Sequence, residues 1–464
     1  MLPMPETMRA MLTAAIASRD RNGFAVDGLA AAVADAGDSL DALAVVAQRL
    51  AAAPHRADWP WHEPDDLEGI RGACPEWPVR ALAAAPADAG ARAAEGFRAA
   101  IAGCVLGKPL EVDPTCAELE RAAVATGTAF PFTGYIAEPL LAALGRRHGS
   151  WIQSARERVV AAPQDDDLNF TLLGLLMLER HGPGFDRHQL IAAWMRNLPA
   201  LQTFGSERVV YVQALLDSLR PWMQSAAPPP AEVDAYGDRW NPREEGCGAA
   251  IRVHAYGLAC PGDPGRAAEL AWRDGRLTHR RTGIYAGMAI AAWIAAAAVV
   301  RDWRAIADAG LAVVPRRSRL HHHLAWARDE VAASAGWREA HARIHARLGG
   351  YGHCQVHQEL ASMLVTLRFA ADPGAAIGMQ VAQGMDTDSF GCASGALAGV
   401  RFGAGSLDPA WLAPLNDRIE HPIAELGEWR IEALAERMAR LPALAATPAM
   451  GGEASASRDA ATGL

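Results

Sequence analysis

Residues 385–399, MDTDSFGCASGALAG, combine oxygen-bearing side chains with a run of small residues. Asp386, Asp388 and Ser389 offer hard oxygen atoms on a tight bend, and such atoms suit Mg²⁺, Mn²⁺ or Ca²⁺ better than zinc. Glycine then recurs at every fourth residue from Gly391 to Gly403, which would place these glycines on one face of a helix. Glycine costs about 1 kcal/mol per helical position relative to alanine, so tertiary contacts must offset this cost. We therefore expect another helix to approach this face closely. A surface Asx turn is the alternative interpretation of the acidic residues.

A second acidic group stands more than 200 residues upstream. Asp165, Asp166 and Asp167 precede residues 168–178, which are apolar on nearly every side and therefore predict a buried helix. Helix capping alone is an alternative, since a carboxylate is favourable near a helix N-terminus. Capping needs one Asp, however, and three adjacent carboxylates repel one another unless a cation lies between them. We therefore expect the two acidic groups to face each other and to hold one or two divalent cations.

Three further motifs accompany the acidic groups: AIAGCVLGKPLE at 100–111, EEGCGAAIRV at 244–253 and LTHRRTGIYAG at 277–287. In their order along the chain, these five motifs resemble the ADP-ribosylglycohydrolase family, which includes ADP-ribosyl-acceptor hydrolases and dinitrogenase-reductase-activating glycohydrolases. That family pairs an early TDDT-like motif with a late DxDT or DxDS motif, and the two hold a di-magnesium centre. The resemblance covers roughly residues 95–440.

The resemblance implies roles for individual residues. Glu111, which follows a Gly-x-Pro turn, would lie beside the metals and act in catalysis together with Asp166. Two Mg²⁺ ions, or Mn²⁺ in their place, would be held by Asp165, Asp166, Asp167, Asp386, Asp388 and Ser389. The residues expected to contact an ADP-ribose-containing or otherwise ribosylated substrate are Gly246, Cys247, Gly248, Arg252 and His279.

Other interpretations of these residues remain open. A glutamate that follows a proline bend, as Glu111 does, is more often a surface residue. The glycines Gly246 and Gly248 allow close backbone approach at a helix start, where free N–H groups can bind a phosphate, but they also suit a simple turn. Arg252 could pair with a diphosphate or with a buried carboxylate. His279 could cap a helix instead of contacting a ligand.

The chain departs from the family pattern at two motifs. Where the family has Thr-Asp-Asp-Thr, this chain has either residues 164–167, QDDD, or residues 165–168, DDDL. The second register places Asp165 at the position of a threonine ligand, and both registers keep Asp166 as a ligand. In the glycine motif, Cys247 replaces an asparagine. These departures leave the metal count and the substrate open.

The apolar periodicity is helical nearly throughout, which predicts an all-α protein. The resemblance implies a compact orthogonal helical bundle with an additional helical segment at the N-terminus. We expect residues 1–90 to form this accessory segment, residues 91–441 the catalytic domain, and residues 442–464 a disordered tail, because the tail is rich in small and polar residues. Residues 283–300 carry no charge, but eight of them are alanine, so a buried helix is favoured over a membrane span.

Composition narrows the class of partner. A net charge of −9 argues against a nucleic-acid-binding protein, which needs clustered positive charge. The seven cysteines are scattered without a CxxC pair, a pattern typical of reduced thiols, so we expect a cytoplasmic protein. No secretory signal is apparent at the N-terminus and no membrane partner is expected.

Three functions fit the sequence. The first is a metal-dependent glycohydrolase that cleaves a ribosyl bond of an ADP-ribosylated substrate. The second is a hydrolase of a small nucleotide- or NAD-derived ribosyl metabolite. The third is a non-enzymatic binding or structural protein on the same scaffold, which the intact acidic groups argue against.

Overall fold

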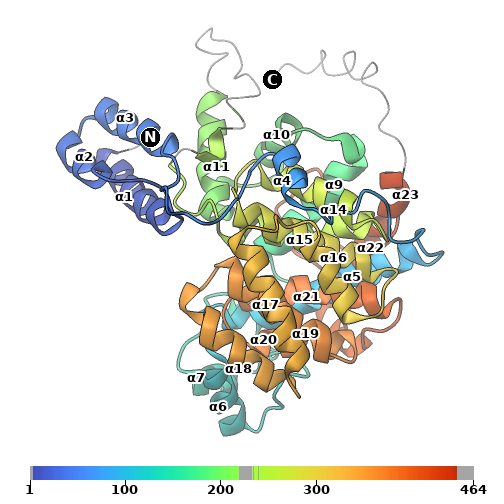
Figure 1. Cartoon of the computed structure of the whole chain (residues 1–464). Coiled ribbons are helices and arrows are strands. Elements are labelled where there is room, and N and C mark those ends of the chain that lie inside the picture. The colour runs from blue at the N-terminus through green and yellow to red at the C-terminus, as the bar shows by residue number, and fades with distance from the viewer. Residues whose placement is uncertain (1–3, 219–232, 234, 239, 447–464) are drawn as a thin grey trace.

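The computed structural model describes residues 4–218, 233, 235–238 and 240–446. The regular secondary structure of these residues is helical, and the β-pairing among them consists of isolated bridges. The predicted all-α class is therefore confirmed. Figure 1 shows a large helical body with three N-terminal helices at its side.

Two glycine-rich helices lie side by side within the body: α5 (Ala89–Gly107) and α21 (Thr387–Phe402). A Cβ atom added to Gly395 would collide with the Ala99 carbonyl, and one added to Gly103 would collide with the Gly391 carbonyl. The backbones thus touch directly, and the predicted close approach of a second helix is confirmed. Gly403 was predicted to lie on the same helix face as the other glycines, and this was wrong. It lies at the C-cap of α21 with a φ of 95° and ends the helix.

Two further buried helices pack around this pair: α9 (Asp166–His181) and α15 (Thr282–Ala297). All residues of α9 from Asp167 to Leu178 are buried, as the apolar pattern predicted. Every residue of α15 is buried, so the uncharged segment is a core helix, as expected. None of the described helices is long and apolar enough to cross a membrane.

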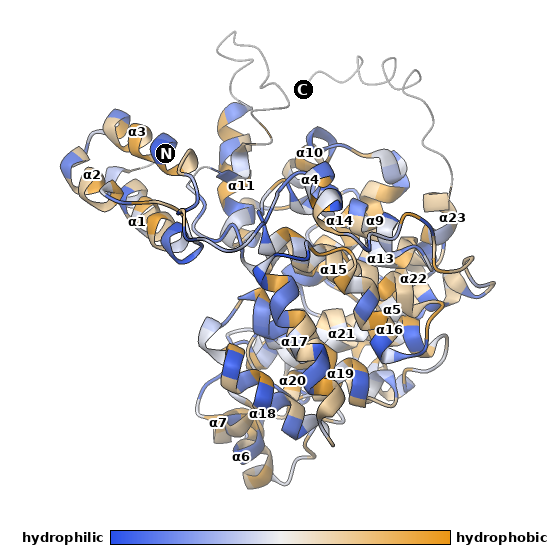
Figure 2. Ribbon diagram, in the orientation of Figure 1, coloured by the Kyte–Doolittle hydropathy of each residue, from blue (hydrophilic) through white to orange (hydrophobic). Residues whose placement is uncertain are grey.

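The remaining helices enclose this core. In Figure 2, α17 and α18 carry hydrophilic residues on their outer faces, whereas α15 and α21 behind them are mainly white to orange. The enclosing α-helices are α6 (Cys116–Thr126), α7 (Glu138–Leu144), α8 (Trp151–Ser154), α10 (Arg187–Asn197), α11 (Gly205–Asp217), α13 (His254–Ala259), α14 (Pro264–Gly275), α16 (Trp303–Leu311), α17 (Arg319–Ala333), α18 (Trp337–Leu348), α19 (Val356–Phe369), α20 (Pro373–Ala382) and α22 (Ile431–Met438). Short 3₁₀ helices are η1 (Lys108–Leu110), η2 (Gly182–Gly184), η3 (Ala200–Gln202), η5 (Tyr236–Asp238), η6 (Cys247–Arg252), η7 (Gly349–Tyr351), η8 (Pro409–Trp411) and η9 (Ala413–Leu415).

The N-terminal segment has two parts. Helices α1 (Pro5–Arg21), α2 (Leu29–Ala36) and α3 (Leu40–Ala51) share a small hydrophobic core of their own. The chain then runs along the main body through α4 (Leu67–Ala73), where the Asp65 carboxylate accepts a hydrogen bond from the Arg281 backbone N–H at 2.6 Å. Asp65 therefore fastens this segment to the body.

The C-terminal end of the described chain is α23 (Leu441–Ala446), in which Leu441 and Ala445 are buried. The first residues of the predicted disordered tail are thus helical, because these two apolar side chains join the core. The rest of that tail lies outside the described residues.

Candidate active site

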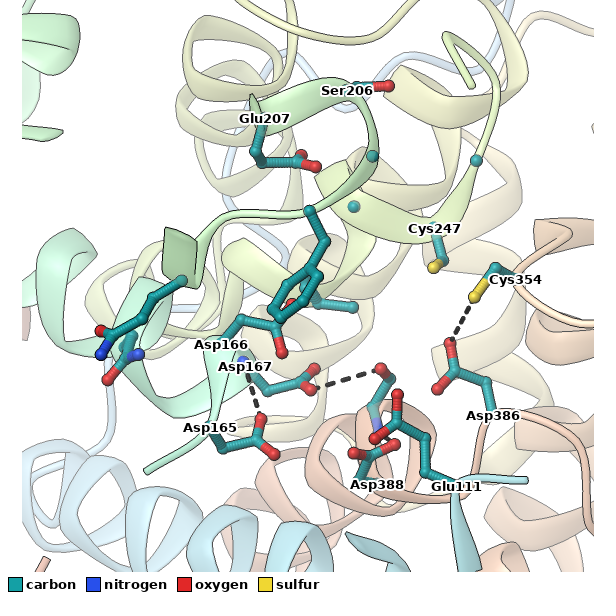
Figure 3. Close-up of a pocket in the computed structure, with 18 of the residues that line it drawn as sticks. Glu111, Asp165, Asp166, Asp167, Ser206, Glu207, Cys247, Cys354, Asp386 and Asp388 are labelled. Carbon is teal, nitrogen blue, oxygen red and sulfur yellow. Dashed lines mark hydrogen bonds between the residues drawn. The ribbon is translucent and has the colours of Figure 1, made fainter. Parts of the chain in front are cut away.

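A cavity of about 510 Å³ opens where the N-terminal ends of α9 and α21 meet the C-terminal end of α5 (Figure 3). Such a volume is in the usual range for small-molecule sites. Most of the residues predicted as site residues line it: Glu111, Asp165, Asp166, Asp167, Gly246, Cys247, Gly248, His279, Asp386, Asp388 and Ser389. The structure therefore brings together motifs that are widely separated in the sequence.

The two acidic groups are in direct contact. The hydroxyl of Ser389 donates a hydrogen bond to Oδ2 of Asp167 at 3.3 Å, across 222 residues of sequence. One carboxylate oxygen each from Asp165, Asp167 and Asp388 lies within 4.8 Å of the other two. Figure 3 shows these carboxylates pointing toward one another. The expectation that the two groups face each other is thus met.

Local structure explains this arrangement. Asp165 is the N-cap of α9 and accepts a hydrogen bond from the Asp167 backbone N–H at 2.9 Å. Asp386 is the N-cap of α21 and follows Met385, whose φ of 67° produces the bend. The Thr387 hydroxyl donates to the Gly107 carbonyl at 2.8 Å, which fixes the start of α21 to the end of α5. Two helix starts and one helix end therefore deliver their side chains to the same point.

Lys108 is a member of this centre that the sequence analysis did not identify. It lies in η1 directly after α5, is buried, and forms an ion pair with Asp165. Burial opposes ionisation of both partners, but their mutual attraction outweighs it. The pKa of Lys108 is therefore raised, and the pKa of Asp165 is lowered.

The other carboxylates of the centre are not balanced in this way. Burial, and then repulsion by neighbouring carboxylates, raises the pKa values of Asp166, Asp167 and Asp388 well above their ordinary range. The Oδ1 atom of Asp167 is buried and has no hydrogen-bond partner. Oxygen ligands with excess negative charge fit a hard divalent cation, so this buried cluster could hold a metal ion.

Glu111 follows η1, as the Gly-x-Pro turn predicted, and its half-buried side chain points into the cavity (Figure 3). Burial is the largest cause of a raised pKa for this carboxyl group, and the charges of Asp165 and Asp386 act in the same direction. His148 lies 3.5 Å away from its carboxylate. A carboxyl group at a cavity wall is placed to give a proton to a bound substrate or to accept one from it, and a raised pKa favours this role.

The glycine loop forms the opposite wall. Gly246, Cys247 and Gly248 line the cavity, and residues 247–252 form η6, so a helix does begin here as predicted. A Cβ atom on Gly248 would collide with the Glu207 carboxylate. The second glycine of the motif is therefore needed for contact with a protein side chain.

Arg252 pairs with buried carboxylates, which is the second of the two roles predicted for it. Its side chain is fully buried, forms an ion pair with Glu207, and donates from Nε to Asp274 at 2.7 Å. Arg252 does not line the cavity, so its assignment as a substrate contact is corrected: it orients Glu207, which does line the cavity. Burial and the neighbouring positive charges lower the pKa of His279, which is buried in the cavity wall next to Glu207.

The sequence profile of the ADP-ribosylglycohydrolase family matches residues 84–447. The chain belongs to the ADP-ribosylglycohydrolase family. Among solved structures, an ADP-ribosylglycohydrolase-related protein complex is similar over 76% of this chain and 99% of that chain, with 20% sequence identity and a TM-score of 0.49. No curated protein matches the chain significantly.

Membership of the ADP-ribosylglycohydrolase family supports a glycohydrolase activity and agrees with the motifs at the cavity. Sequence reasoning missed Lys108 and Glu207, which both line it. Lys108 occupies the variable position of the Gly-x-Pro turn, and its place three residues before the predicted catalytic Glu111 was the available signal. Glu207 lies in the first turn of α11, where an acidic residue is ordinary, and no sequence signal distinguished it.

Proposed function

We propose that this protein is a metal-dependent hydrolase of a ribosyl glycosidic bond, acting on an ADP-ribosylated substrate. The observation that carries the proposal is the contact between the two acidic groups through Ser389 and Asp167. It gathers oxygen ligands from two helix starts beside a cavity large enough for a small molecule.

The geometry favours the register in which Asp165 takes the place of the family's threonine ligand. Asp165 is the N-cap of α9 and contributes an oxygen to the cluster with Asp167 and Asp388. Asp165, Asp166, Asp167, Asp386, Asp388 and Ser389 would hold two Mg²⁺ ions, or Mn²⁺ in their place.

Cleavage of a ribosyl bond passes through a transition state with oxocarbenium character, which needs a fixed sugar, a water nucleophile and a proton donor or acceptor. Bound divalent ions would supply orientation of the ribose hydroxyls and polarisation of water. Glu111 is placed to exchange the proton, since its carboxyl group lies at the cavity wall and has a raised pKa. The glycine loop and His279 form the side of the cavity that would receive the rest of the nucleotide.

Glu111→Gln tests this role. It keeps the size and hydrogen-bonding capacity of the side chain but cannot exchange a proton, so kcat should fall by about 10²–10⁴-fold, the usual contribution of general acid–base catalysis. The measurement is release of ADP-ribose from ADP-ribosylated protein in the presence of Mg²⁺. Glu120→Gln, in which an exposed glutamate loses its surface ion pair with Arg338, is the matched control. Equal turnover of the two variants would refute the assignment.

A second candidate is hydrolysis of a small nucleotide- or NAD-derived ribosyl compound. It is favoured by Cys247, which stands in the cavity wall where the family has an asparagine. Turnover of small ADP-ribosyl compounds such as O-acetyl-ADP-ribose, with none of modified protein, would select this candidate. A binding or structural protein would show no turnover of either class.

A further inference from the structure

Two cysteines face each other at the edge of the cavity, next to the acidic cluster. Gly246 and Gln355 form an isolated antiparallel bridge. In an antiparallel pair, the residues one step beyond a bridged pair also lie opposite each other, which places Cys247 opposite Cys354. One ligand atom each from Cys247, Cys354 and Asp386 lies within 4.8 Å of the other two. Figure 3 shows both sulfur atoms on the same side of the cavity as Asp386.

Asp386 joins this thiol pair to the acidic cluster. The Cys354 thiol donates to Oδ2 of Asp386 at 3.5 Å. The backbone N–H of Asp386 in turn donates to a buried glutamate, Glu359, at 3.3 Å. Asp386 thus lies between the sulfur atoms of the two cysteines on one side and the carboxylates of the acidic cluster on the other.

The chemistry of the two sides differs. Carboxylate and hydroxyl oxygens suit Mg²⁺ or Mn²⁺, whereas thiolates suit zinc and other thiophilic ions. Catalytic zinc sites commonly have three protein ligands and one open position. Two sulfurs and one carboxylate at the cavity wall supply such a set. The adjacent His353 also lines the cavity, and its buried Nδ1 has no hydrogen-bond partner.

The other cysteines do not form such a set. Among the described residues, no other pair of cysteines contributes to a group of three potential metal ligands. Cys74, Cys104, Cys260 and Cys392 are buried, and Cys116 is partly buried in α6. The arrangement at Cys247 and Cys354 is therefore specific to the cavity.

We propose that Cys247, Cys354 and Asp386 form a binding position for a thiophilic divalent cation of the zinc type, adjacent to the hard-ion cluster. On binding, each thiol loses its proton to solvent and the metal gains two thiolate ligands and one carboxylate ligand. All three residues line the cavity, so a bound ion would be accessible from it. Asp386 is also a candidate ligand of the acidic cluster, so an ion bound here would lie next to that cluster. The catalytic meaning of this position rests on the proposed hydrolase function, but its metal binding does not.

The test uses the full-length, reduced, metal-free chain titrated with Co²⁺, followed by displacement with Zn²⁺. Thiolate coordination gives an intense sulfur-to-cobalt charge-transfer band, which carboxylate ligands alone do not give. We expect this band at one equivalent of Co²⁺, and its loss when Zn²⁺ is added. Equilibrium dialysis measures the Zn²⁺ affinity independently of enzymatic activity.

Cys247→Ser and Cys354→Ser should each lower the Zn²⁺ affinity by more than about 100-fold. Removing an outer-shell partner of a metal ligand costs up to about 100-fold, and removing a ligand itself should cost more. Cys116→Ser is the matched control and should keep both the band and the affinity. Thermal melting of the metal-free variants checks that each remains folded. Should a cavity variant fail to fold, the charge-transfer band of the wild-type chain still decides whether thiolates bind the metal.

Two results would overturn the proposal. One is the absence of a charge-transfer band in the reduced wild-type chain. The other is ready formation of a Cys247–Cys354 disulfide with no thiol-dependent metal binding, which would make the pair a redox element. Asp167→Asn separates this inference from the hydrolase function. This variant should lose Mg²⁺-dependent turnover and keep the cobalt band. If only the proposed hydrolase function is wrong, the wild-type chain will show the band and no turnover.

Discussion

Two buried groups of charged residues in this protein differ in their balance of charge. The first, here called the arginine network, joins Glu63, Glu244 and Glu245 to Arg19, Arg281 and Arg319. The second, the acidic cluster, contains Glu111, Asp165, Asp166, Asp167, Asp386 and Asp388, with Lys108 paired to Asp165. Both are withdrawn from solvent, but the pKa of Glu245 in the first is lowered, whereas the pKa values of Asp166, Asp167 and Asp388 in the second are raised.

In the arginine network each carboxylate has a guanidinium partner. Arg281 donates from Nε to Glu245 at 2.6 Å, and Arg319 donates from Nη2 to Glu245 at 2.6 Å and to Glu63 at 2.8 Å. Burial opposes ionisation of Glu245, but the two arginines outweigh it and lower its pKa to about 2. This network fastens the N-terminal segment to the main body, since Glu63 and Arg19 belong to that segment.

In the acidic cluster, Asp166, Asp167 and Asp388 have no lysine or arginine ion pair among the described residues. Their pKa values rise well above the ordinary range, because burial and mutual repulsion act together. The contrast teaches that burial of charge alone does not mark a functional site. A buried excess of one sign does, because only an added ion or proton can balance it.

The largest expected effect is that of Asp388→Ala. It should abolish hydrolysis and lower the affinity for Mg²⁺ by more than about 100-fold, since it removes a candidate ligand itself and not only an outer partner. The free energy of unfolding of the metal-free chain should stay the same or increase, because a repelled carboxylate is removed. Activity assays and calorimetric Mg²⁺ titration check this, with the exposed Asp329→Ala as control. Unchanged turnover in Asp388→Ala would contradict the metal-dependent mechanism.

Arg319→Met tests the contribution of the arginine network to stability. It leaves the buried Glu63 without an ion-pair partner and removes one of the two arginine partners of Glu245, so the free energy of unfolding should fall by about 3–5 kcal/mol. Arg316→Met breaks an exposed pair with Glu76 and should cost less than about 1 kcal/mol. Urea unfolding measures both. A similar, small loss in the two variants would show that the arginine network contributes no more than a surface pair.

The pH dependence of the metal-free protein sharpens the comparison further. Because the folded-state pKa values of Asp166, Asp167 and Asp388 are raised, folding takes up protons, and stability should decrease as the pH rises above their ordinary pKa of 3.8. Each group contributes up to about 1.4 kcal/mol per pH unit within its window. Glu245 acts oppositely, and its contribution is lost only as the pH falls from about 4.5 toward its folded pKa of about 2. Urea unfolding between pH 5 and 8 measures the slope, and saturating Mg²⁺ should abolish or reverse it.

The smallest effect is expected for Lys108→Met. Removal of the ammonium group frees Asp165 for a metal and removes a competing positive charge, so the affinity for Mg²⁺ should rise by about tenfold, or about 1.4 kcal/mol. Isothermal titration of variant and wild type measures the change. Weaker Mg²⁺ binding would show instead that Lys108 positions Asp165 as a ligand. Arg147→Met, on the exposed loop before α8, is a control for loss of a positive charge near the cavity.

Much of this centre was predictable from local sequence. Three consecutive carboxylates before an apolar helix, and a DxDS motif before a glycine stripe, identified both acidic groups without coordinates. The roles of Arg252 and Lys108 were not predictable in this way. Whether an arginine meets a diphosphate or a carboxylate depends on Glu207 and Asp274, which come from other helices. Lys108 could be placed beside Asp165 only once the end of α5 was positioned against the start of α9.

The sequence by itself determined the helical class, the two buried helix starts that carry carboxylates, and the small residues that allow α5 and α21 to touch. These properties depend on residue type and on spacings of three or four residues, which a helix converts directly into faces. Only the tertiary structure decided which charges are paired, that Cys247 and Cys354 lie close to Asp386, and that Arg252 lies behind the cavity wall. Electrostatic balance and metal coordination depend on distances of a few ångströms between residues from distant parts of the chain, and folding alone sets those distances.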